Sequence, residues 1–283
     1  MKIIRSLPKL PPRPDDGHKG LFGRVLVVGG NEDMIGAPVL AGTAALRMGS
    51  GLVQVAMPRS VLAAGLSVTP ELIGLGLERS GGKDRLLAAC QAADAIVVGP
   101  GLGQSPEAGK YLTELIRLDK PMVIDADGLN WLAGQRRWPA AFKAQAVLTP
   151  HPGEMKRLGK LLKREDVPKD DAGRLELAGE AARAFGQVIV LKGHRTVVTD
   201  GEVAYVNRTG DSSLAKAGAG DVLSGIIGCL LGQGVNRFEA AVMGVHLHGR
   251  AGELAGKQWG KRSVLACDVI EALSEAIAEY ERA

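Results

Sequence analysis

Residues 216–228 read KAGAGDVLSGIIG, and this stretch decides how the 283-residue chain is interpreted. Small residues let the backbone approach a ligand closely, and the apolar residues behind them recur at helical spacing. The stretch predicts a glycine-rich turn at the start of a buried helix, where free N–H groups and the helix dipole hold phosphate. Asp221 falls in the first turn, and a carboxylate beside transferred phosphate suits a catalytic base. The alternative is a tight turn with an Asp near the N-cap, and this pattern alone does not decide between them.

Short apolar runs alternate with helical patterns along the rest of the chain. Strands are predicted at residues 24–30, 52–57, 95–101, 121–125, 146–149 and 188–192. Helices are predicted at 36–49, 83–93, 106–118, 128–133, 174–185, 221–231, 237–254 and 267–280. This alternation predicts an α/β fold whose central, mainly parallel sheet is covered by helices on both faces. Two β-rich runs, 196–200 and 202–206, flank an Asp-Gly turn and predict a hairpin.

No linker, repeat or low-complexity tract interrupts the pattern. A single domain over residues 1–283 is therefore expected, with residues 1–16 as an extended N-terminal arm. No apolar run reaches the length of a membrane span, and the Pro- and Lys-rich N-terminus lacks the apolar core of a signal peptide. The sequence therefore predicts a cytoplasmic protein with no membrane partner.

The composition argues against a nucleic-acid partner. Aromatic residues make up only 4% of the chain, too few for surfaces that stack on single-stranded nucleic acid. The net charge of +4 is mild and spread along the sequence, which suits anionic small molecules better than a nucleic-acid backbone. We therefore expect small-molecule ligands.

The cysteines and the paired histidines do not predict a metal site. Cys90, Cys229 and Cys267 are far apart and odd in number, which favours small core residues in a reducing compartment. His246 and His248 are two residues apart in a helical pattern and so point to different faces, as core or interface residues. The tryptophans, Trp259 among them, are expected to be packing residues.

Glycines and polar residues gather at the ends of successive predicted strands. They occupy residues 29–30, 99–103, 125–130, 149–154 and 192–193. Open α/β sheets bind ligands at the carboxyl ends of their strands. Five such segments at successive strand ends predict one site along one edge of the sheet.

Each segment has a functional and a purely structural interpretation. The turn at 192–196 holds nucleotide phosphates or ribose, or it is a turn with solvated side chains. Glu154 holds a hydrated Mg²⁺ through water, or it is a first-turn residue of a helix, and both can be true. Asp125, Asp127 and Asn130 position a Mg²⁺-bound water or a ribose hydroxyl, or one of the aspartates is an N-cap.

The ordered set of motifs resembles the ADP/ATP-dependent NAD(P)H-hydrate dehydratases, a family within the ribokinase-like superfamily of small-molecule kinases. The turn at 218–221 with its helix resembles the superfamily, and the whole set resembles the family. The resembling segments are 18–23, 27–30, 36–38, 99–103, 125–130, 149–154, 191–193 and 218–225. The resemblance covers residues from about 17 to 275 and implies a ribokinase-like three-layer sandwich.

The family implies dehydration of the S-epimer of hydrated NADH or NADPH, with release of AMP or ADP and phosphate. It implies that Asp221 is the base and that the N–H groups of Gly218 and Gly220 form an anion hole. The implied nucleotide-binding residues are Lys192, Gly193, His194, Arg195, Thr196 and Gly220. The implied residues for the hydrated dinucleotide are Ala37, Gly101, Leu102, Gly103, Asn130, His151 and Asp221. Glu154 would support Mg²⁺ through water, and ADP is favoured over ATP.

Two other functions fit part of the pattern. A vitamin or sugar kinase of the same superfamily would release a stable phosphorylated product instead of free phosphate. A non-catalytic nucleotide sensor would have no need of the Asp221 carboxylate, which repels phosphate. The sequence departs from the family at Ala217, which stands before Gly218 at a position where many relatives have glycine. The methyl group of Ala217 is tolerated there only if the φ of this residue is negative.

The resemblance also bears on partners. It suggests a homotetramer. Because the first predicted strand begins at residue 24, any epimerase that works with this chain is expected to be a separate protein.

Overall fold

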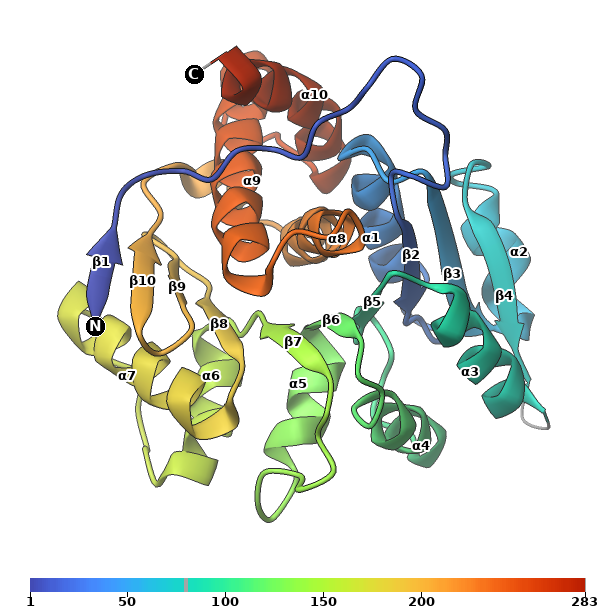
Figure 1. Ribbon diagram of the computed structural model, residues 1–283, viewed down its shortest axis with the longest axis horizontal. Coiled ribbons are helices and arrows are strands. Elements are labelled where there is room, and N and C mark those ends of the chain that lie inside the picture. Colours follow the sequence, from blue (N-terminus) through green and yellow to red (C-terminus); the bar gives the residue numbers. More distant parts are fainter. Residues whose placement is uncertain (79–80, 283) are drawn as a thin grey trace.

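A ten-stranded sheet forms the centre of the molecule in the computed structural model, which describes residues 1–78 and 81–282 (Figure 1). The strand order is β1-β10-β9-β8-β7-β6-β5-β2-β3-β4. β9 runs antiparallel to both of its neighbours, and the other pairs are parallel. The strands are β1 Lys2–Ile4, β2 Arg24–Val28, β3 Leu52–Pro58, β4 Ile73–Leu77, β5 Ala95–Val98, β6 Pro121–Ile124, β7 Gln145–Leu148, β8 Val188–Leu191, β9 Val197–Thr199 and β10 Val203–Val206.

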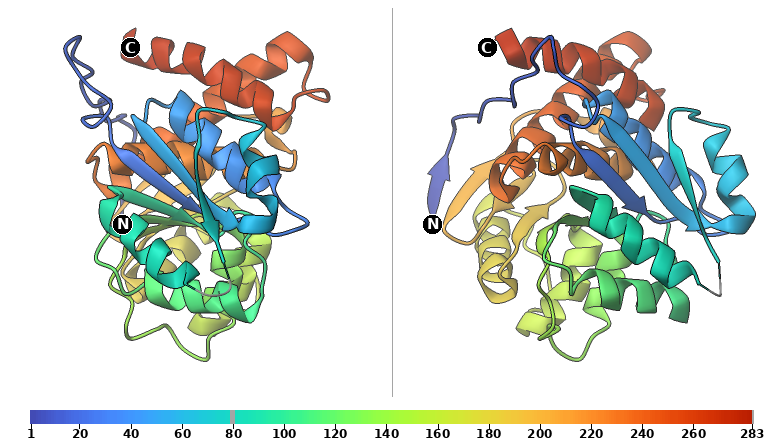
Figure 2. Two further views of the ribbon diagram at one scale, coloured as in Figure 1. Left: turned by 90° about the vertical axis from the view of Figure 1, so that its right-hand side faces the viewer. Right: turned by 45° about the vertical axis from the view of Figure 1, so that its right-hand side comes forward.

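Helices cover both faces of the sheet (Figures 1 and 2). α1, α8 and α9 lie on one face with α10 packed outside them, and α3 to α7 lie on the other. The helices are α1 Gly36–Arg47, α2 Arg59–Leu66, α3 Gly82–Ala92, α4 Pro106–Leu115, α5 Ala126–Ala133, α6 Pro152–Gly159, α7 Asp171–Phe185, α8 Ala219–Gly232, α9 Arg237–Trp259 and α10 Ala266–Arg282. Short 3-10 turns occupy Lys160–Leu162 and Ser212–Leu214.

The central strands are apolar throughout because both of their faces are covered. In β2, Val25 and Val27 pack into the core beneath α1, α8 and α9, whereas Leu26 and Val28 pack into the core on the opposite face. Successive side chains of a strand point to opposite faces, so a strand with two covered faces needs a continuous apolar run. The predicted α/β class, with a mainly parallel sheet between two helical layers, is confirmed.

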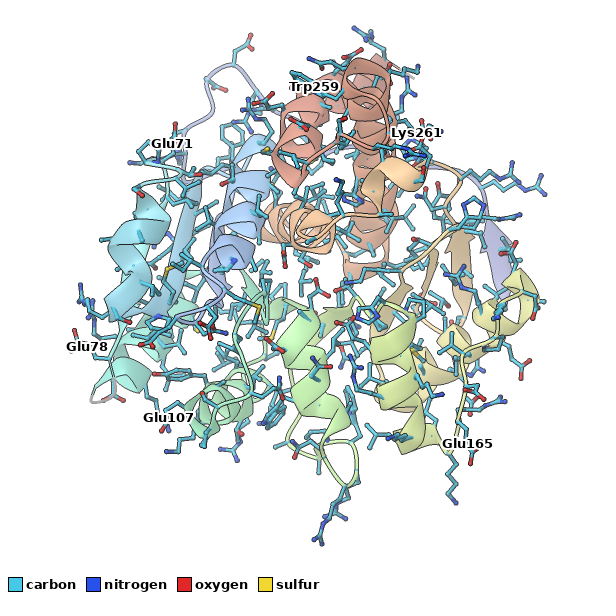
Figure 3. The ribbon with its side chains drawn as sticks, turned by 180° about the vertical axis from the view of Figure 1, so that it is seen from behind. Glu71, Glu78, Glu107, Glu165, Trp259 and Lys261 are labelled. Atoms are coloured by element: carbon cyan, nitrogen blue, oxygen red, sulfur yellow. The ribbon has the colours of Figure 1, made fainter. Side chains whose placement is uncertain are left out.

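Some local features were missed or wrongly assigned. Within the arm expected at residues 1–16, Lys2–Ile4 forms β1, which adds to the sheet edge beside β10. β4 and α2 were missed: β4 is interrupted by two glycines, and α2 follows β3 directly with no polar linker between them. Cys267 is exposed on α10 and not a core residue. Trp259, at the end of α9, is half exposed rather than packed (Figure 3).

Helix α8, which carries Asp221, packs against α1 without an intervening side chain. A Cβ atom on Gly225 would lie 2.0 Å from the carbonyl oxygen of Ala41, which is closer than atoms can approach. We expect Gly225→Ala to lower the free energy of unfolding by about 3 kcal/mol, because the two helix backbones must separate. Denaturant unfolding measures this loss. Gly36→Ala is the control, because a Cβ there meets no atom within 4 Å, and a Gly225→Ala loss no larger than the control's would contradict the packing.

Candidate active site

The five segments predicted at strand ends lie along one edge of the sheet. They follow β8, β7, β6, β5 and β2, which are consecutive in the strand order, and these strands are mutually parallel. Their carboxyl ends therefore meet at the same edge, as the sequence predicted.

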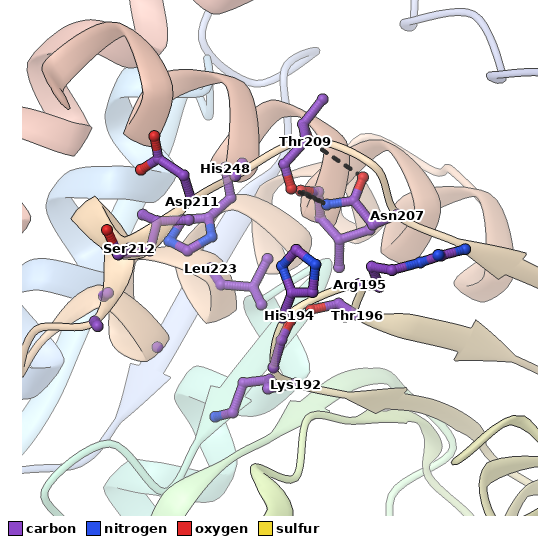
Figure 4. Close-up of a pocket in the computed structure, with 18 of the residues that line it drawn as sticks. Lys192, His194, Arg195, Thr196, Asn207, Thr209, Asp211, Ser212, Leu223 and His248 are labelled. Atoms are coloured by element: carbon purple, nitrogen blue, oxygen red, sulfur yellow. Dashed lines mark hydrogen bonds between the residues drawn. The ribbon is translucent and has the colours of Figure 1, made fainter. Parts of the chain in front are cut away.

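A cavity of about 570 Å³ opens between the turn at 192–196 and the start of α8 (Figure 4). This volume falls in the usual range of small-molecule sites. All of the residues predicted to bind the nucleotide line it, namely Lys192, Gly193, His194, Arg195, Thr196 and Gly220, together with His151. The lining residues that the sequence analysis missed include Asn207, Thr209, Asp211, Ser212, Leu223 and His248.

Five of the missed lining residues belong to the polar stretch NRTGDS, residues 207–212, which follows the hairpin: Asn207, Thr209, Gly210, Asp211 and Ser212. Its run of turn-forming residues after β10 was a usable signal. Asn207 is buried and donates to the carbonyl of Val245, and Thr209 donates to the carbonyl of His246, so α9 fixes this stretch as one wall of the cavity. His248 also lines the cavity, and burial lowers its pKa to about 4, so its imidazole is neutral.

The turn at 192–196 is shaped by a buried arginine that the sequence analysis did not single out. Arg174 of α7 donates to the carbonyl oxygens of Leu191, Lys192 and His194, at 3.1, 3.3 and 2.5 Å. Arg195 has a φ of +57°, in the left-handed region that residues with side chains seldom adopt. Such strain persists only where surrounding contacts impose it, and it concentrates at functional sites.

The start of α8 has the geometry of an anion site. Gly218 is the N-cap residue with a φ of +89°, and the N–H groups of Gly220 and Asp221 follow in the first turn, where the helix provides no acceptor. Ala217 is not among the non-glycine residues of positive φ, which over the described chain are Ala126, Lys163 and Arg195. The condition that the sequence analysis set for Ala217 is therefore met.

A buried charge cluster lies beside this helix start. The Lys192 ammonium donates to Asp125 Oδ1 at 2.7 Å and lies 3.9 Å from Glu154 Oε2. The same ammonium would lie 3.3 Å from a Cβ built on Gly220. Burial raises the pKa of Asp221 to about 7, and the charge of Asp125 adds to this shift while Lys192 opposes it.

The Asp125–Lys192 pair is ionised. Burial on its own would raise the pKa of Asp125, but the Lys192 charge and the hydrogen bonds from Lys192, Ser224 and Thr149 outweigh burial and lower it. Burial would likewise lower the pKa of Lys192, but the carboxylates of Asp125 and Glu154 raise it. Asp125 stands at the N-cap position of α5 without making a side-chain cap bond, so the structure does not support the N-cap interpretation of Asp125.

His151 and Glu154 form the cap of α6. The N–H groups of Gly153 and Glu154 donate to His151 Nδ1, and the His151 N–H donates to Glu154 Oε2 at 2.7 Å. Burial raises the pKa of Glu154 to about 7, although Lys192 opposes this shift. Glu154 is thus a first-turn helix residue, and its carboxylate still faces the charge cluster.

The residues predicted for the dinucleotide lie on the neighbouring loops. The Gly103 N–H donates to Asp127 Oδ2 at 2.8 Å, and Asn130 Nδ2 donates to Asp127 Oδ1 at 3.3 Å. Arg157 Nε in turn donates to Asn130 Oδ1 at 2.9 Å, which places an exposed guanidinium at this side of the edge. A Cβ on Gly101 would lie 3.2 Å from that of Ala37, so these two residues adjoin.

The structure separates the two predicted sets. The cavity lining includes His151 but, over the described parts of the chain, not the other dinucleotide residues or Gly218. The Leu102 side chain is buried in the core, so only its backbone is available to a ligand. In residues 1–78 and 81–282, no group of three His, Cys, Asp or Glu side chains could hold a metal ion, and no helix is long and apolar enough to cross a membrane.

A family model described as NAD(P)H-hydrate dehydratase matches residues 25–275. The ADP-dependent (S)-NAD(P)H-hydrate dehydratase of Neisseria meningitidis is 41% identical over 259 residues, which cover 88% of this chain and 82% of that protein. The bifunctional NAD(P)H-hydrate repair enzyme of Moorella thermoacetica is 42% identical over 283 residues, covering 96% of this chain. The chain spans about half the length of the bifunctional relatives it matches, 52% in that case.

Among solved structures, the ADP/ATP-dependent NAD(P)H-hydrate dehydratase of Bacillus subtilis, co-crystallised with ATP and Mg²⁺, superimposes with a TM-score of 0.82. It is 31% identical, and the match covers 96% of this chain and 95% of that one. Ribokinase-like proteins are also among the structural matches, which confirms the predicted ribokinase-like three-layer fold.

Proposed function

This chain belongs to the NAD(P)H-hydrate dehydratase family, and from that premise we propose that it dehydrates the S-epimer of hydrated NADH or NADPH at the expense of a nucleotide. The observation that carries the proposal is the start of α8. There a carboxylate with a raised pKa, Asp221, lies in the first helical turn, with the Lys192 ammonium close to Gly220 at the edge of a nucleotide-sized cavity. Base, anion site and counter-ion are the parts that phosphoryl transfer needs.

The proposed reaction has two steps. In the first step, Asp221 takes the proton of the ring hydroxyl while the hydroxyl oxygen attacks the terminal phosphorus of the nucleotide. The bond between that phosphorus and the bridging oxygen breaks, and its electrons stay on AMP or ADP. The nitrogen lone pair of the ring then expels phosphate by breaking the C–O bond, and loss of a proton from the neighbouring carbon restores the dihydropyridine. Phosphorylation is needed because hydroxide is a poor leaving group and phosphate is a good one.

Fixed charges and N–H groups of the protein would supply most of the stabilisation of the transition state for phosphoryl transfer. The N–H groups of Gly218 and Gly220 lie at the start of α8, whose dipole favours negative charge at this end. The ammonium of Lys192 would meet the same phosphate. Since α8 is packed directly on α1, these groups need little reorganisation during the reaction.

We assign the cavity to ADP or ATP, with ADP favoured. The turn at 192–196 would hold the phosphates and ribose, and Ala37, residues 101–103, Asn130 and His151 would hold the hydrated dinucleotide. Glu154 fits a Mg²⁺ held through water: it is a buried carboxylate beside the phosphate region, and Mg²⁺ usually combines one or two carboxylates with substrate phosphates and waters. When bound, Mg²⁺ would neutralise phosphate charge.

The pH dependence follows from the raised pKa of Asp221. A base must be ionised, so kcat/KM, which reports the free enzyme, is expected to rise with pH through an apparent pKa of about 7 and to fall at lower pH. The Lys192 ammonium lowers this pKa, so Lys192→Met should move the rising limb to higher pH. Measuring kcat/KM from about pH 5 to about pH 9 tests both statements. A flat profile in this range would remove Asp221 as the base.

An absorbance assay tests the proposed function. The protein is mixed with hydrated NADH, Mg²⁺ and either ADP or ATP, and the return of the near-ultraviolet NADH band is followed together with phosphate. Recovery of NADH with release of phosphate supports the proposal and identifies the nucleotide. Nucleotide binding without recovery would overturn it and favour the small-alcohol kinase, whose product keeps its phosphate.

We also propose a cytoplasmic homotetramer whose activity complements that of an NAD(P)H-hydrate epimerase. The three free cysteines suit a reducing compartment. The bifunctional relatives are about twice as long as this chain, which supports a second activity that acts on the same metabolite.

A further inference from the structure

Asp125 is a buried carboxylate to which the proposed reaction gives no role. It is 1% exposed, directly after β6, and it is not among the residues that line the cavity. It does not cap α5, and the next residue, Ala126, has a φ of +47° in the left-handed region. A strained backbone and a buried charge both raise the free energy of the folded state, so other contacts in the protein must stabilise them.

Those contacts join three elements of the site. Lys192, just after β8, donates to Asp125 Oδ1 at 2.7 Å, and Ser224 Oγ of α8 donates to Oδ2 at 2.6 Å. Both carboxylate oxygens are therefore occupied, one by the cation and one by the helix that carries Gly220 and Asp221. Such charge-assisted bonds are stronger and more directional than neutral ones.

The consequence concerns the position of Lys192. A lysine has a long, flexible side chain and a point charge, so its ammonium needs an anchor to be held at one place. The Asp125 carboxylate provides that anchor, and the ammonium then lies 3.3 Å from a Cβ built on Gly220. Asp125 Oδ2 would lie 3.8 Å from the same Cβ position on Gly220, so the Asp125 carboxylate and the Lys192 ammonium both adjoin the start of α8.

We propose that Asp125 is a positioning residue which, anchored by Ser224, fixes the Lys192 ammonium beside Gly220 so that its charge meets the nucleotide phosphate. The expected effect of Asp125 on kcat rests on the proposed function. The expected effect on nucleotide affinity does not, because the Lys192 ammonium would bind the nucleotide phosphate whatever reaction follows. Asp125 acts through Lys192 and touches no reacting atom.

A double-mutant cycle tests this. Asp125→Asn, Lys192→Met and the double variant are compared for ADP and ATP affinity by calorimetry and for kcat in the dehydration assay. Asp125→Asn should lower affinity or kcat about tenfold when Lys192 is present, and should have no further effect in the Lys192→Met background. Asp166→Asn, which removes the charge of an exposed ion pair with Lys156, is the matched control and should change neither quantity.

The outcomes separate the inference from the proposed function. If the two single effects multiply in the double variant, Asp125 acts independently of Lys192 and the inference fails, whatever the enzyme's activity. If nucleotide binding shows the coupling but no NADH is recovered, the positioning role stands and the proposed function fails. If Asp125→Asn does not fold, a Ser224→Ala cycle with Lys192→Met decides by the same rule, with an expected single effect of about threefold.

Discussion

Asp221→Asn is expected to reduce kcat for dehydration about 10³-fold while nucleotide affinity is kept or improved. The amide has nearly the same shape as the carboxylate but cannot accept the hydroxyl proton. Removing the charge also removes a repulsion, since Asp221 lies in the first turn of α8 where the nucleotide phosphate would bind. Steady-state kinetics and calorimetry with ADP and ATP measure the two effects separately.

The matched control is Asp84→Asn, an exposed aspartate in the first turn of α3 on the other side of the sheet. It should leave kcat and nucleotide affinity unchanged. Full activity in Asp221→Asn would remove Asp221 as the base. A parallel loss of activity and nucleotide affinity would instead assign Asp221 to binding.

Lys192→Ala is expected to weaken nucleotide binding about 10- to 100-fold, because a cation that meets phosphate is removed from a partly buried position. It should also lower the free energy of unfolding at neutral pH by about 3–5 kcal/mol, since Asp125 loses its counter-ion inside the protein. Calorimetry measures the affinity, and denaturant unfolding measures the stability.

The stability loss in Lys192→Ala should depend on pH. In the wild-type protein the pKa of Asp125 is lowered, so its contribution to stability is present above the unfolded-state pKa and is lost as pH falls through the folded-state value. Without Lys192, burial raises that pKa, and the variant becomes less stable as pH rises above the unfolded-state value. The difference between wild type and variant should therefore shrink in acid. Unchanged nucleotide affinity would remove Lys192 from the site, and a difference in stability that does not vary with pH would contradict the ion pair.

The sheet and its binding edge could be predicted because they depend on short-range patterns. Apolar runs such as 95–101 and 188–192 need two covered faces, and parallel strands bring their carboxyl ends to one edge. The predicted nucleotide residues at 192–196 are consecutive in the chain, and the structure places them and Gly220 around one cavity. That they bind a nucleotide stays a prediction.

Contacts across long stretches of sequence could not be predicted. Asp125 meets Lys192 and Ser224, which are 67 and 99 residues away, and each residue alone has an ordinary local interpretation. Arg174 is the first residue of the helix predicted at 174–185 and was given no role, yet it is buried beneath the turn at 192–196. The sequence gives the type of each side chain, but the strand order decides which ones meet.

The central claim is that the ring hydroxyl leaves as phosphate after phosphorylation, and isotope labelling tests it most directly. Hydrated NADH is prepared in ¹⁸O-water so that the ring hydroxyl carries the label, and it is then converted in unlabelled water with Mg²⁺ and nucleotide. Mass spectrometry of the released phosphate should find one ¹⁸O atom for each NADH restored. Unlabelled phosphate beside fully restored NADH would contradict the account, because the hydroxyl would then have left as water without passing through a phosphate ester.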